Sequence, residues 1–286
     1  MSRTLVLRFS GAICFSIVSW MACSRSEVKR PSNRLNKITD DLYEIEGDGG
    51  NVAFYITDQG VILVDDKFDF DFEDILTKIK SVTRQPVNYV LNTHHHHDHT
   101  GSNGKFLPMA QIISTVMARN NIIRANKKGK LQLVPAQVVF TQEYEVFLGG
   151  KQVQARYYGR GHTNGDAVIY FPALRILHTG DLMAVGNPFV DYSYGGSIVD
   201  WTKTLDEVLK LDFDTVIPGH GPIAKKADLL AFRNQLEKLR NRTSGLVSEG
   251  KTKDDIAKLL MAEFGLAADS ALIRGSLDGL INELRR

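Results

Sequence analysis

The residue types best suited to chemistry are concentrated in one short segment, Thr93 to His99, which reads THHHHDH. Within it, His94, His96, Asp98 and His99 form the pattern His-x-His-x-Asp-His. Histidines two positions apart in an extended segment face the same way, and the aspartate and histidine that follow can face a neighbouring position. Zinc prefers imidazole nitrogen and carboxylate oxygen. This one segment can therefore supply two ligands to each of two metal ions.

A run of four consecutive histidines has two simpler explanations, and the position and composition of the run argue against both. A purification tag lies at a terminus, whereas this run lies in the interior of a 286-residue chain. A loose metal-sequestering tract is longer and lacks an ordered aspartate. The segment therefore favours a specific metal site.

Three later segments each place one more ligand-type residue beside glycine. They are His162 in GHTNGD, Asp181 in HTGD and His220 in IPGHG. A lone histidine beside glycine is usually structural. These residues, however, follow or end predicted strands, where an α/β sheet gathers its functional loops. We therefore expect all three to join the site formed by residues 94–99.

The surrounding pattern predicts the elements that must position these residues. Short β-rich runs alternate with turns rich in Gly and Asp, and apolar residues recur at helical spacing between Asp71 and Val82. A strand, a helix and a further strand in this order indicate a crossover unit. The strands predicted up to the histidine segment are 42–45, 52–56, 61–64 and 87–91.

Beyond the histidine segment the alternation continues and then gives way to helical patterns. A helix is predicted over 109–127 and a short one over 202–209. Thr252 followed by Asp255 matches a helix N-cap box. Residues 226–286 carry few β signals and several apolar stripes, so we expect a C-terminal helical extension that packs on the domain or forms a dimer contact. The later predicted strands are 137–140, 144–148, 151–158, 167–171, 175–177 and 215–217.

Together these motifs resemble the metallo-β-lactamase superfamily. Its ordered motifs are an aspartate after the first hydrophobic strands, then HxHxDH, then His, Asp and His. The resemblance covers roughly residues 38–225. It implies an α/β fold, a four-layer αββα sandwich in which two mixed sheets pack face to face, helices lie outside and metals lie at one edge. The matching positions are Asp65, His94, His96, Asp98, His99, His162, Asp181 and His220.

The resemblance also implies a role for each matching residue. His94, His96 and His162 would hold a first zinc ion. Asp181 would bridge to a second zinc held by Asp98, His99 and His220. Asp65 would orient the loop 94–99, although its neighbour Asp66 is an alternative by sequence. The remaining histidines match no ligand position and are expected to be structural or to support the ligands: His95, His97 and His178.

The implied chemistry is hydrolysis with two Zn²⁺ ions per chain; iron or manganese are the alternative metals. A hydroxide bridging the metals would attack a carbonyl, and Asp98 would hold it and shuttle its proton. The substrate would be a small molecule: an ester, lactone, thioester or β-lactam amide. Dedicated β-lactamases of the family usually replace the bridging aspartate by cysteine or serine, whereas this chain has Asp181. We expect the segment that contains Asn187, Tyr192 and Tyr194 to line the substrate cleft; the two tyrosines either bind substrate or pack, and packing is favoured.

Two other functions are compatible with the same residues. One is an enzyme that resembles persulfide dioxygenases, with a single iron held by two histidines and an aspartate. The other is a non-catalytic zinc-binding periplasmic protein. Metal content and turnover distinguish both from a dinuclear zinc hydrolase.

The first 22 residues are typical of an export signal. Arg3 and Arg8 precede an apolar run too short to span a bilayer, and a buried N-terminal helix is the alternative. A linker is predicted over 23–37. Cys14 lies within the signal, so an internal disulfide is excluded after cleavage. Cys23 follows the apolar run as in a lipoprotein signal. We expect either lipidation at Cys23, the one route to membrane attachment, or simple release into the periplasm.

Charge argues against one class of partner. The formal net charge is +2, and Arg3 and Arg8 are the only charges in the first 22 residues, so the chain after cleavage is formally neutral. It lacks the broad basic field that nucleic-acid binding usually needs. Hydrophobic residues at 43% and charged residues at 24% are ordinary for a globular protein. The oligomeric state stays open.

Overall fold

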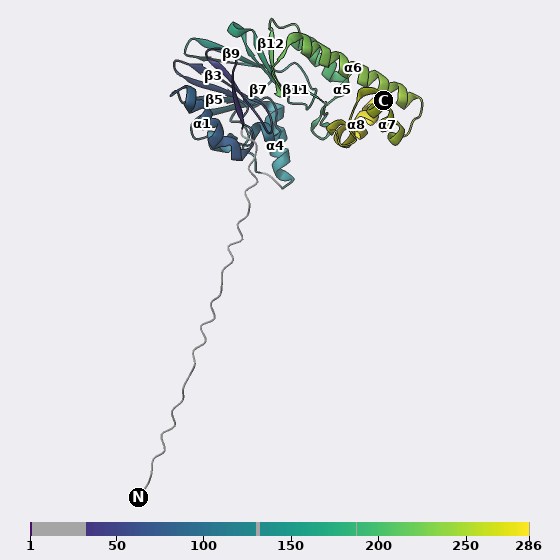
Figure 1. The fold of residues 1–286 in the computed structure, drawn as a ribbon, viewed down its shortest axis with the longest axis horizontal. Helices are drawn as coiled ribbons and strands as arrows, with labels where there is room; N and C mark the ends of the chain where they lie inside the picture. Colours follow the sequence, from purple (N-terminus) through teal and green to yellow (C-terminus); the bar gives the residue numbers. More distant parts are fainter. Residues whose placement is uncertain (2–32, 130–131, 187, 286) are drawn as a thin grey trace. The chain divides into compact units, whose positions relative to one another are not determined.

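The computed structural model describes Met1 and residues 33–129, 132–186 and 188–285. The expected export signal (apart from Met1), Cys23, most of the expected linker and Asn187 lie outside these described residues. Residues Ser32–Arg286 form one unit of contacts, and Figure 1 labels its elements. Within the described part, no helix has the length and apolar character needed to cross a membrane.

A seven-stranded sheet contains the first half of the unit, with its strands in sequence order. The first four strands pair antiparallel, and β4 to β7 pair parallel. The strands are β1 Arg34–Lys37, β2 Leu42–Glu46, β3 Val52–Thr57, β4 Gly60–Val64, β5 Val87–Leu91, β6 Gln111–Thr115 and β7 Val138–Phe140.

A six-stranded sheet in the order β13-β12-β11-β10-β9-β8 contains the second half. Its pairs are antiparallel except for β11 with β12, which run parallel. The strands are β8 Glu143–Leu148, β9 Lys151–Arg156, β10 Val168–Phe171, β11 Ile176–Ala184, β12 Thr215–His220 and β13 Ala224–Lys225.

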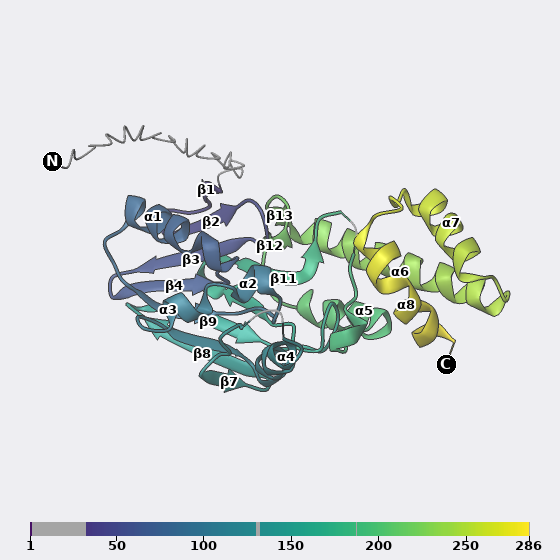
Figure 2. The ribbon, with the colours of Figure 1, turned by 90° about the horizontal axis from the view of Figure 1, so that it is seen from below.

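Alternating side chains join the two sheets into a sandwich. Tyr55 and Ile62 of the first sheet and Ile169 and Phe171 of the second belong to one buried cluster. The ring of Phe171 meets that of Tyr55 edge-on at 5.4 Å. Because successive strand residues face opposite sides, the neighbours of these residues point outward, where helices cover them. Figure 2 shows the two sheets against each other.

Helices complete the two outer layers. On the first sheet, Phe72 and Ile75 of α1 and Phe106 of α3 pack with the outward residues of β3 and β4. On the second sheet, outward residues such as Leu177 pack with Trp201 and the C-terminal helices. The fold is therefore a four-layer αββα sandwich with a C-terminal helical region. The helices are α1 Phe72–Val82, α2 His97–Thr100, α3 Asn103–Phe106, α4 Val116–Lys127, α5 Ile198–Val208, α6 Lys226–Ser248, α7 Lys253–Phe264 and α8 Leu277–Leu284.

Four short helical turns complete the elements. Three are 3₁₀ turns, and the fourth, η4, is a π-turn that runs directly into α8. Thr252 caps α7, since its side chain accepts a hydrogen bond from the backbone N–H of Asp255. The turns are η1 Asp69–Asp71, η2 Pro172–Leu174, η3 Tyr192–Tyr194 and η4 Leu272–Ser276.

Three expectations from the sequence are corrected. The helix predicted over 109–127 begins only at Val116, because Gln111–Thr115 forms β6 beside β5 and the buried Ile112 and Ile113 alternate between its faces. The last part of the linker predicted over 23–37 is instead a strand, since Arg34–Lys37 forms β1 along β2. The strand predicted over 175–177 continues to Ala184, with register shifts against β12 on either side of Gly180.

Candidate metal centre

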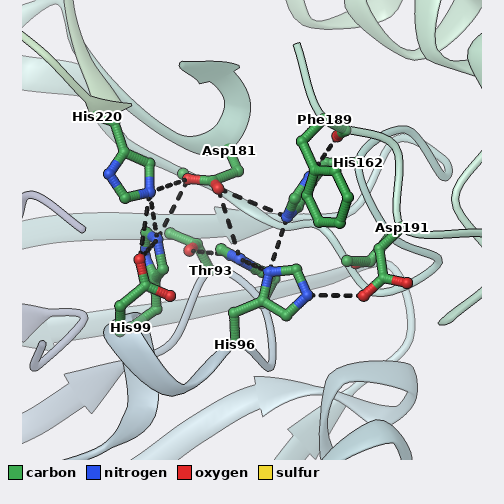
Figure 3. Close-up of polar contacts among 12 residues, drawn as sticks. Thr93, His96, His99, His162, Asp181, Phe189, Asp191 and His220 are labelled. Atoms are coloured by element: carbon green, nitrogen blue, oxygen red, sulfur yellow. Dashed lines mark hydrogen bonds and ion pairs between the residues drawn. The ribbon is translucent and has the colours of Figure 1, made fainter. Parts of the chain in front are cut away.

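All seven residues expected as ligands meet at one edge of the sandwich, as Figure 3 shows for most of them. The segment after β5 supplies His94 and His96, and the single turn of α2 supplies Asp98 and His99. The second sheet supplies the other three, from the β9–β10 connection, from β11 and from the end of β12: His162, Asp181 and His220.

The first ligand group contains His94, His96, His162 and Asp181, whose ligand atoms lie within 4.8 Å of one another. Nδ1 of His96 lies 3.1 Å from Nε2 of His94 and 2.9 Å from Nε2 of His162. Ligands of a tetrahedral zinc are about 3.3 Å apart at normal bond lengths. Three imidazole nitrogens converging on one point at these separations fit a shared cation.

The second ligand group contains Asp98, His99 and His220. Nε2 of His220 lies 3.4 Å from Nε2 of His99 and 3.3 Å from Oδ2 of Asp98. These separations again match those around a single tetrahedral ion, about 3.3 Å. Two imidazole nitrogens and one carboxylate oxygen suit zinc and other divalent metals that prefer nitrogen and oxygen ligands.

Asp181 divides its carboxylate between the two groups. Oδ2 faces His162 at 3.5 Å, whereas Oδ1 faces His99 at 3.2 Å and His220 at 3.4 Å. Oδ1 is buried, and among the described residues no donor forms a hydrogen bond of good geometry with it. A Cβ at Gly219 would lie 2.0 Å from the same atom. The buried oxygen thus lacks a hydrogen-bond donor, and the absence of a side chain at Gly219 leaves space beside it. Both features fit a carboxylate that would bridge two metal ions.

Four ligand imidazoles have an oxygen partner on the ring nitrogen that faces away from the ligand group. Nδ1 of His99 lies 2.7 Å from Oδ2 of Asp65, and Nδ1 of His94 lies 3.1 Å from Oγ1 of Thr93. Nδ1 of His162 lies 2.7 Å from the carbonyl of Phe189, and Nε2 of His96 lies 2.9 Å from Oδ2 of Asp191. Such partners fix the tautomer and orientation of a metal-binding imidazole.

The structure distinguishes the two neighbouring aspartates after β4. The carboxylate of Asp65 accepts hydrogen bonds from the backbone N–H and the hydroxyl of Thr93, both at 2.7 Å, besides its contact with His99. Asp66 accepts one from the backbone N–H of Ser102 at 2.9 Å. Burial raises the pKa of Asp66 well above its usual range. Asp65 is therefore the residue whose carboxylate contacts the histidine segment, whereas Asp66 meets it through its backbone N–H, which donates to the carbonyl of His99.

A buried lysine holds the turn beside the second ligand group. The side chain of Lys67 is fully buried, and its Nζ donates to the carbonyls of Asp48 and Gly50 at 3.1 and 2.7 Å. A Cβ at Gly50 would lie 2.3 Å from the ring of His99. The amide of Asn51 then donates to the carbonyls of residues 218 and 221, on either side of His220. This turn thereby joins both sheets next to the ligands.

The histidines that match no ligand position have different surroundings. His178 lies 3.1 Å from the carbonyl of Asn51 through Nε2 and accepts from the backbone N–H of Gly180. His97 lines the cleft over the ligands. His95 is buried against the ring of Tyr194 at 4.2 Å between centroids, and with His96 and Asp191 it forms a third His/Asp group that shares His96 with the first.

The electrostatics of the centre reflect buried histidines beside carboxylates. Burial lowers the pKa of His162 to about 4, which favours the neutral imidazole that binds metals. Burial also acts to lower the pKa of His220, but the nearby carboxylates of Asp181 and Asp98, 3.4 and 3.3 Å from its Nε2, outweigh burial and raise that pKa to about 9. The buried carboxylates therefore attract positive charge to this edge of the sandwich.

A cleft of about 500 Å³ opens over both ligand groups. Ligand residues form its floor, and apolar side chains form part of its wall: Ala184, Val185, Phe189 and Ala271. The expectation that Tyr192 and Tyr194 line this cleft is corrected. The hydroxyl of Tyr192 donates to Glu283, and Tyr194 packs on His95 and under Arg124. Asn187 lies outside the described residues.

Sequence reasoning missed several residues that contact the ligands or line the cleft. Asp191 directly precedes Tyr192 in the segment expected at the cleft, but no motif in the sequence indicates that it contacts His96. The only sequence signal for Lys67 is its position directly after two aspartates at the end of a predicted strand. Ala271 comes from the C-terminal helical region, for which only packing or a dimer contact was expected. The groups that these residues contact lie far from them in sequence, so only the folded structure reveals their roles.

The sequence profile of the metallo-beta-lactamase superfamily matches residues 45–220. The chain belongs to this superfamily. Members of the superfamily are generally metal-dependent hydrolases that act on small molecules. The matched range runs from β2 to the last ligand, His220, so it includes the whole candidate centre.

The individual relatives of this chain have names that point to different activities. The 2,4-dinitroanisole O-demethylase subunit alpha of Nocardioides sp. (strain JS1661) is 32% identical over 142 residues, which cover 48% of this chain and 41% of that subunit. The match thus spans less than half of the subunit's length. Metallo-beta-lactamase type 2 of Elizabethkingia meningoseptica is 24% identical over 233 residues, which cover 74% of this chain and 90% of that enzyme.

Solved metallo-beta-lactamase structures share the fold. One from Pontibacter korlensis superposes with a TM-score of 0.63 at 22% identity, covering 72% of this chain and 99% of its own. The DIM-1 enzyme superposes with a TM-score of 0.63 at 22% identity, covering 73% and 98%. These superpositions leave about a quarter of this chain unmatched, whereas they include almost all of each metallo-beta-lactamase chain.

Proposed function

We propose that this protein is a dinuclear zinc hydrolase that cleaves a carboxylic ester, lactone, thioester or β-lactam amide. The division of the Asp181 carboxylate between two His-containing groups carries this proposal, because a single-metal site would not need both oxygens. His94, His96 and His162 would hold one ion and Asp98, His99 and His220 the other, with Asp181 shared.

Bound zinc supplies a water of lowered pKa and a Lewis acid for the substrate carbonyl. The residues of the chain prepare the site for this chemistry. Asp65 and Asp191 orient the imidazoles of His99 and His96, and burial keeps His94 and His162 neutral. Asp98 and Asp181 both belong to ligand groups and line the cleft. Because Asp181 is the carboxylate shared between the two groups, we assign the uptake and delivery of protons to Asp98.

The cleft wall favours a substrate with an uncharged, apolar part. Phe189 and Ala271 face the same cleft as the ligands, and their burial by a substrate would stabilise the complex by about 25 cal/mol per Å² of apolar surface. The names of relatives support β-lactams as one class to test and add a second, aryl methyl ethers such as 2,4-dinitroanisole.

The deciding experiment is metal analysis of the purified protein followed by a substrate panel. We expect two zinc ions per chain and turnover of at least one ester, lactone, thioester or β-lactam. One iron per chain with oxygen consumption would instead support the persulfide dioxygenase-like alternative. Two zinc ions without turnover of any panel member, including 2,4-dinitroanisole, would favour a zinc-binding protein without catalytic activity.

We further propose that the protein is exported through residues 1–22, which carry the basic and apolar regions of a signal sequence. Fractionation of the bacterial envelope tests export, and lipid labelling of the wild type against Cys23→Ser tests lipidation. Recovery of the uncleaved chain in the cytoplasm would refute both.

A further inference from the structure

One loop supplies partners to two histidines of the first ligand group. The loop 188–197 contributes the carbonyl of Phe189, 2.7 Å from Nδ1 of His162, and the carboxylate of Asp191, 2.9 Å from Nε2 of His96. Both contacts are on the ring nitrogens that face away from the metal group, as Figure 3 shows. The position of this loop therefore determines where the other nitrogens of His96 and His162 point.

The far end of the chain holds this loop in place. Glu283 lies on α8, and its carboxylate accepts three hydrogen bonds from the end of the loop and the start of α5. Oε2 accepts from the hydroxyl of Tyr192 at 2.8 Å and from the backbone N–H of Ile198 at 3.1 Å, and Oε1 accepts from the hydroxyl of Ser197. These residues are 85 to 91 positions away in sequence, so the contact exists only in the folded protein.

A second set of contacts shows that the loop fits closely against the C-terminal segment. The hydroxyl of Ser276 accepts from the N–H of Val190 at 2.8 Å and donates to its carbonyl at 3.0 Å. A Cβ at Gly275 would lie 2.8 Å from the ring of Phe189, and one at Gly279 would lie 2.1 Å from that of Tyr192. Ser276 ends the π-turn η4, a local geometry that is frequent near functional sites.

We propose that Glu283 is a positioning residue of the metal centre, which acts through the loop 188–197 to orient His96 and His162. The C-terminal helical region is then part of the functional site, since Ala271, directly before η4, also forms cleft wall. This inference rests on the proposed role of both histidines as metal ligands. Loss of the Glu283 carboxylate removes three of the hydrogen bonds that hold the loop, so the partners of both rings are held less firmly.

The test uses the full chain with Glu283→Ala, Glu283→Gln and the control Asp278→Ala. Asp278 lies on the same helix and pairs with Lys253 at the surface. Zinc affinity is measured by chelator competition, and ligand geometry by the visible absorption of the cobalt-substituted protein. We expect about tenfold weaker binding of one zinc and an altered cobalt spectrum for Glu283→Ala, at the lower end of what loss of a ligand's hydrogen-bond partner costs. Glu283→Gln, which keeps an acceptor oxygen, should recover most of the affinity, and Asp278→Ala should match the wild type.

The outcomes separate this inference from the proposed function. A wild-type protein that binds no zinc refutes the metal centre itself. A wild type that binds two zinc ions, together with a folded Glu283→Ala variant of unchanged affinity and spectrum, overturns only the role of Glu283. If Glu283→Ala does not fold, Tyr192→Phe decides, because it removes a single donor to Glu283. A weakened zinc site then supports the inference, and unchanged affinity and spectrum overturn it.

Discussion

Nδ1 of His99 lies 2.7 Å from Oδ2 of Asp65, and both side chains are fully buried. Asp65 reaches this position directly after β4 with a φ of 58°, a left-handed conformation that is uncommon for residues other than glycine. Backbone strain of this kind is typical of functional sites. The contact directs Nε2 of His99 toward Asp181, which lies 3.2 Å away, and thereby connects the end of the first sheet with the candidate metal centre.

Replacing Asp65 by Ala should weaken zinc binding about 10- to 100-fold, because His99 loses the partner that fixes its ring. Chelator competition on the purified protein measures this change. Asp69→Ala is the control, since that exposed residue lies on η1 a few positions further along. Equal affinities in the two variants would contradict the orienting role of Asp65.

Substitution of ligands should change metal stoichiometry in a defined way. His96→Ala and Asp181→Ala are each expected to remove at least one zinc ion and most hydrolytic activity, since His96 belongs to the first group and Asp181 to both. His95→Ala should keep both ions, although loss of a buried ring lowers stability. Elemental analysis of the three variants measures this directly, and equal loss in all three would falsify the ligand assignment.

A glycine beside the shared carboxylate should be essential for metal binding. In Gly219→Ala the new Cβ would lie 2.0 Å from Oδ1 of Asp181, so the carboxylate must move. We expect loss of at least one zinc ion. Gly245→Ala is the matched control, because a Cβ there meets nothing within 4 Å, and in α6 it should stabilise the protein by up to about 1 kcal/mol. Normal zinc content in Gly219→Ala would show that Asp181 tolerates displacement.

Asp191→Ala should selectively weaken the first zinc ion, because His96 loses its carboxylate partner at 2.9 Å. A reduction of about tenfold is expected. Asp191→Asn keeps an oxygen acceptor and should retain more affinity. Asp212→Ala, which breaks a surface ion pair with Arg175, is the control. Titration of the metal-free variants with zinc shows whether one of the two binding steps changes, and a shift of both or neither would argue against a local effect.

Glu44 should make stability depend on pH. Burial raises its pKa from 4.5 to about 6 in the folded protein. Because the folded state disfavours the ionised form, the wild type loses stability as pH rises from about 4.5 and reaches the full loss above about 6. The loss relative to Glu44→Gln corresponds to about 2 kcal/mol. Urea unfolding of both proteins at pH 4.5 and pH 7.5 measures it, and a difference that does not grow with pH would contradict the shift.

The sequence alone identified the donors of the candidate centre and the family fold. The pattern of His94, His96, Asp98 and His99 is local, since a short segment after a strand presents these side chains whatever the rest of the chain does. The sequence also predicts His162, Asp181 and His220, because each lies beside glycine at the end of a predicted strand, where an α/β sheet gathers its functional loops. Alternating hydrophobic residues likewise predicted most strands, although the run at 111–115 was taken for part of a helix.

Tertiary structure alone decided how these donors are supported and what covers them. Asp191 contacts His96 from 95 positions away, and Glu283 holds the same loop through Tyr192 from 91 positions away. Neither residue belongs to a local pattern, because a hydrogen bond between distant segments leaves no periodic signal in sequence. Tyr192 itself was expected in the cleft, yet it packs against α8. The physical reason is that a sequence motif specifies which residue types can bind a metal. The orientation of each imidazole ring depends instead on which groups the fold places beside its other nitrogen.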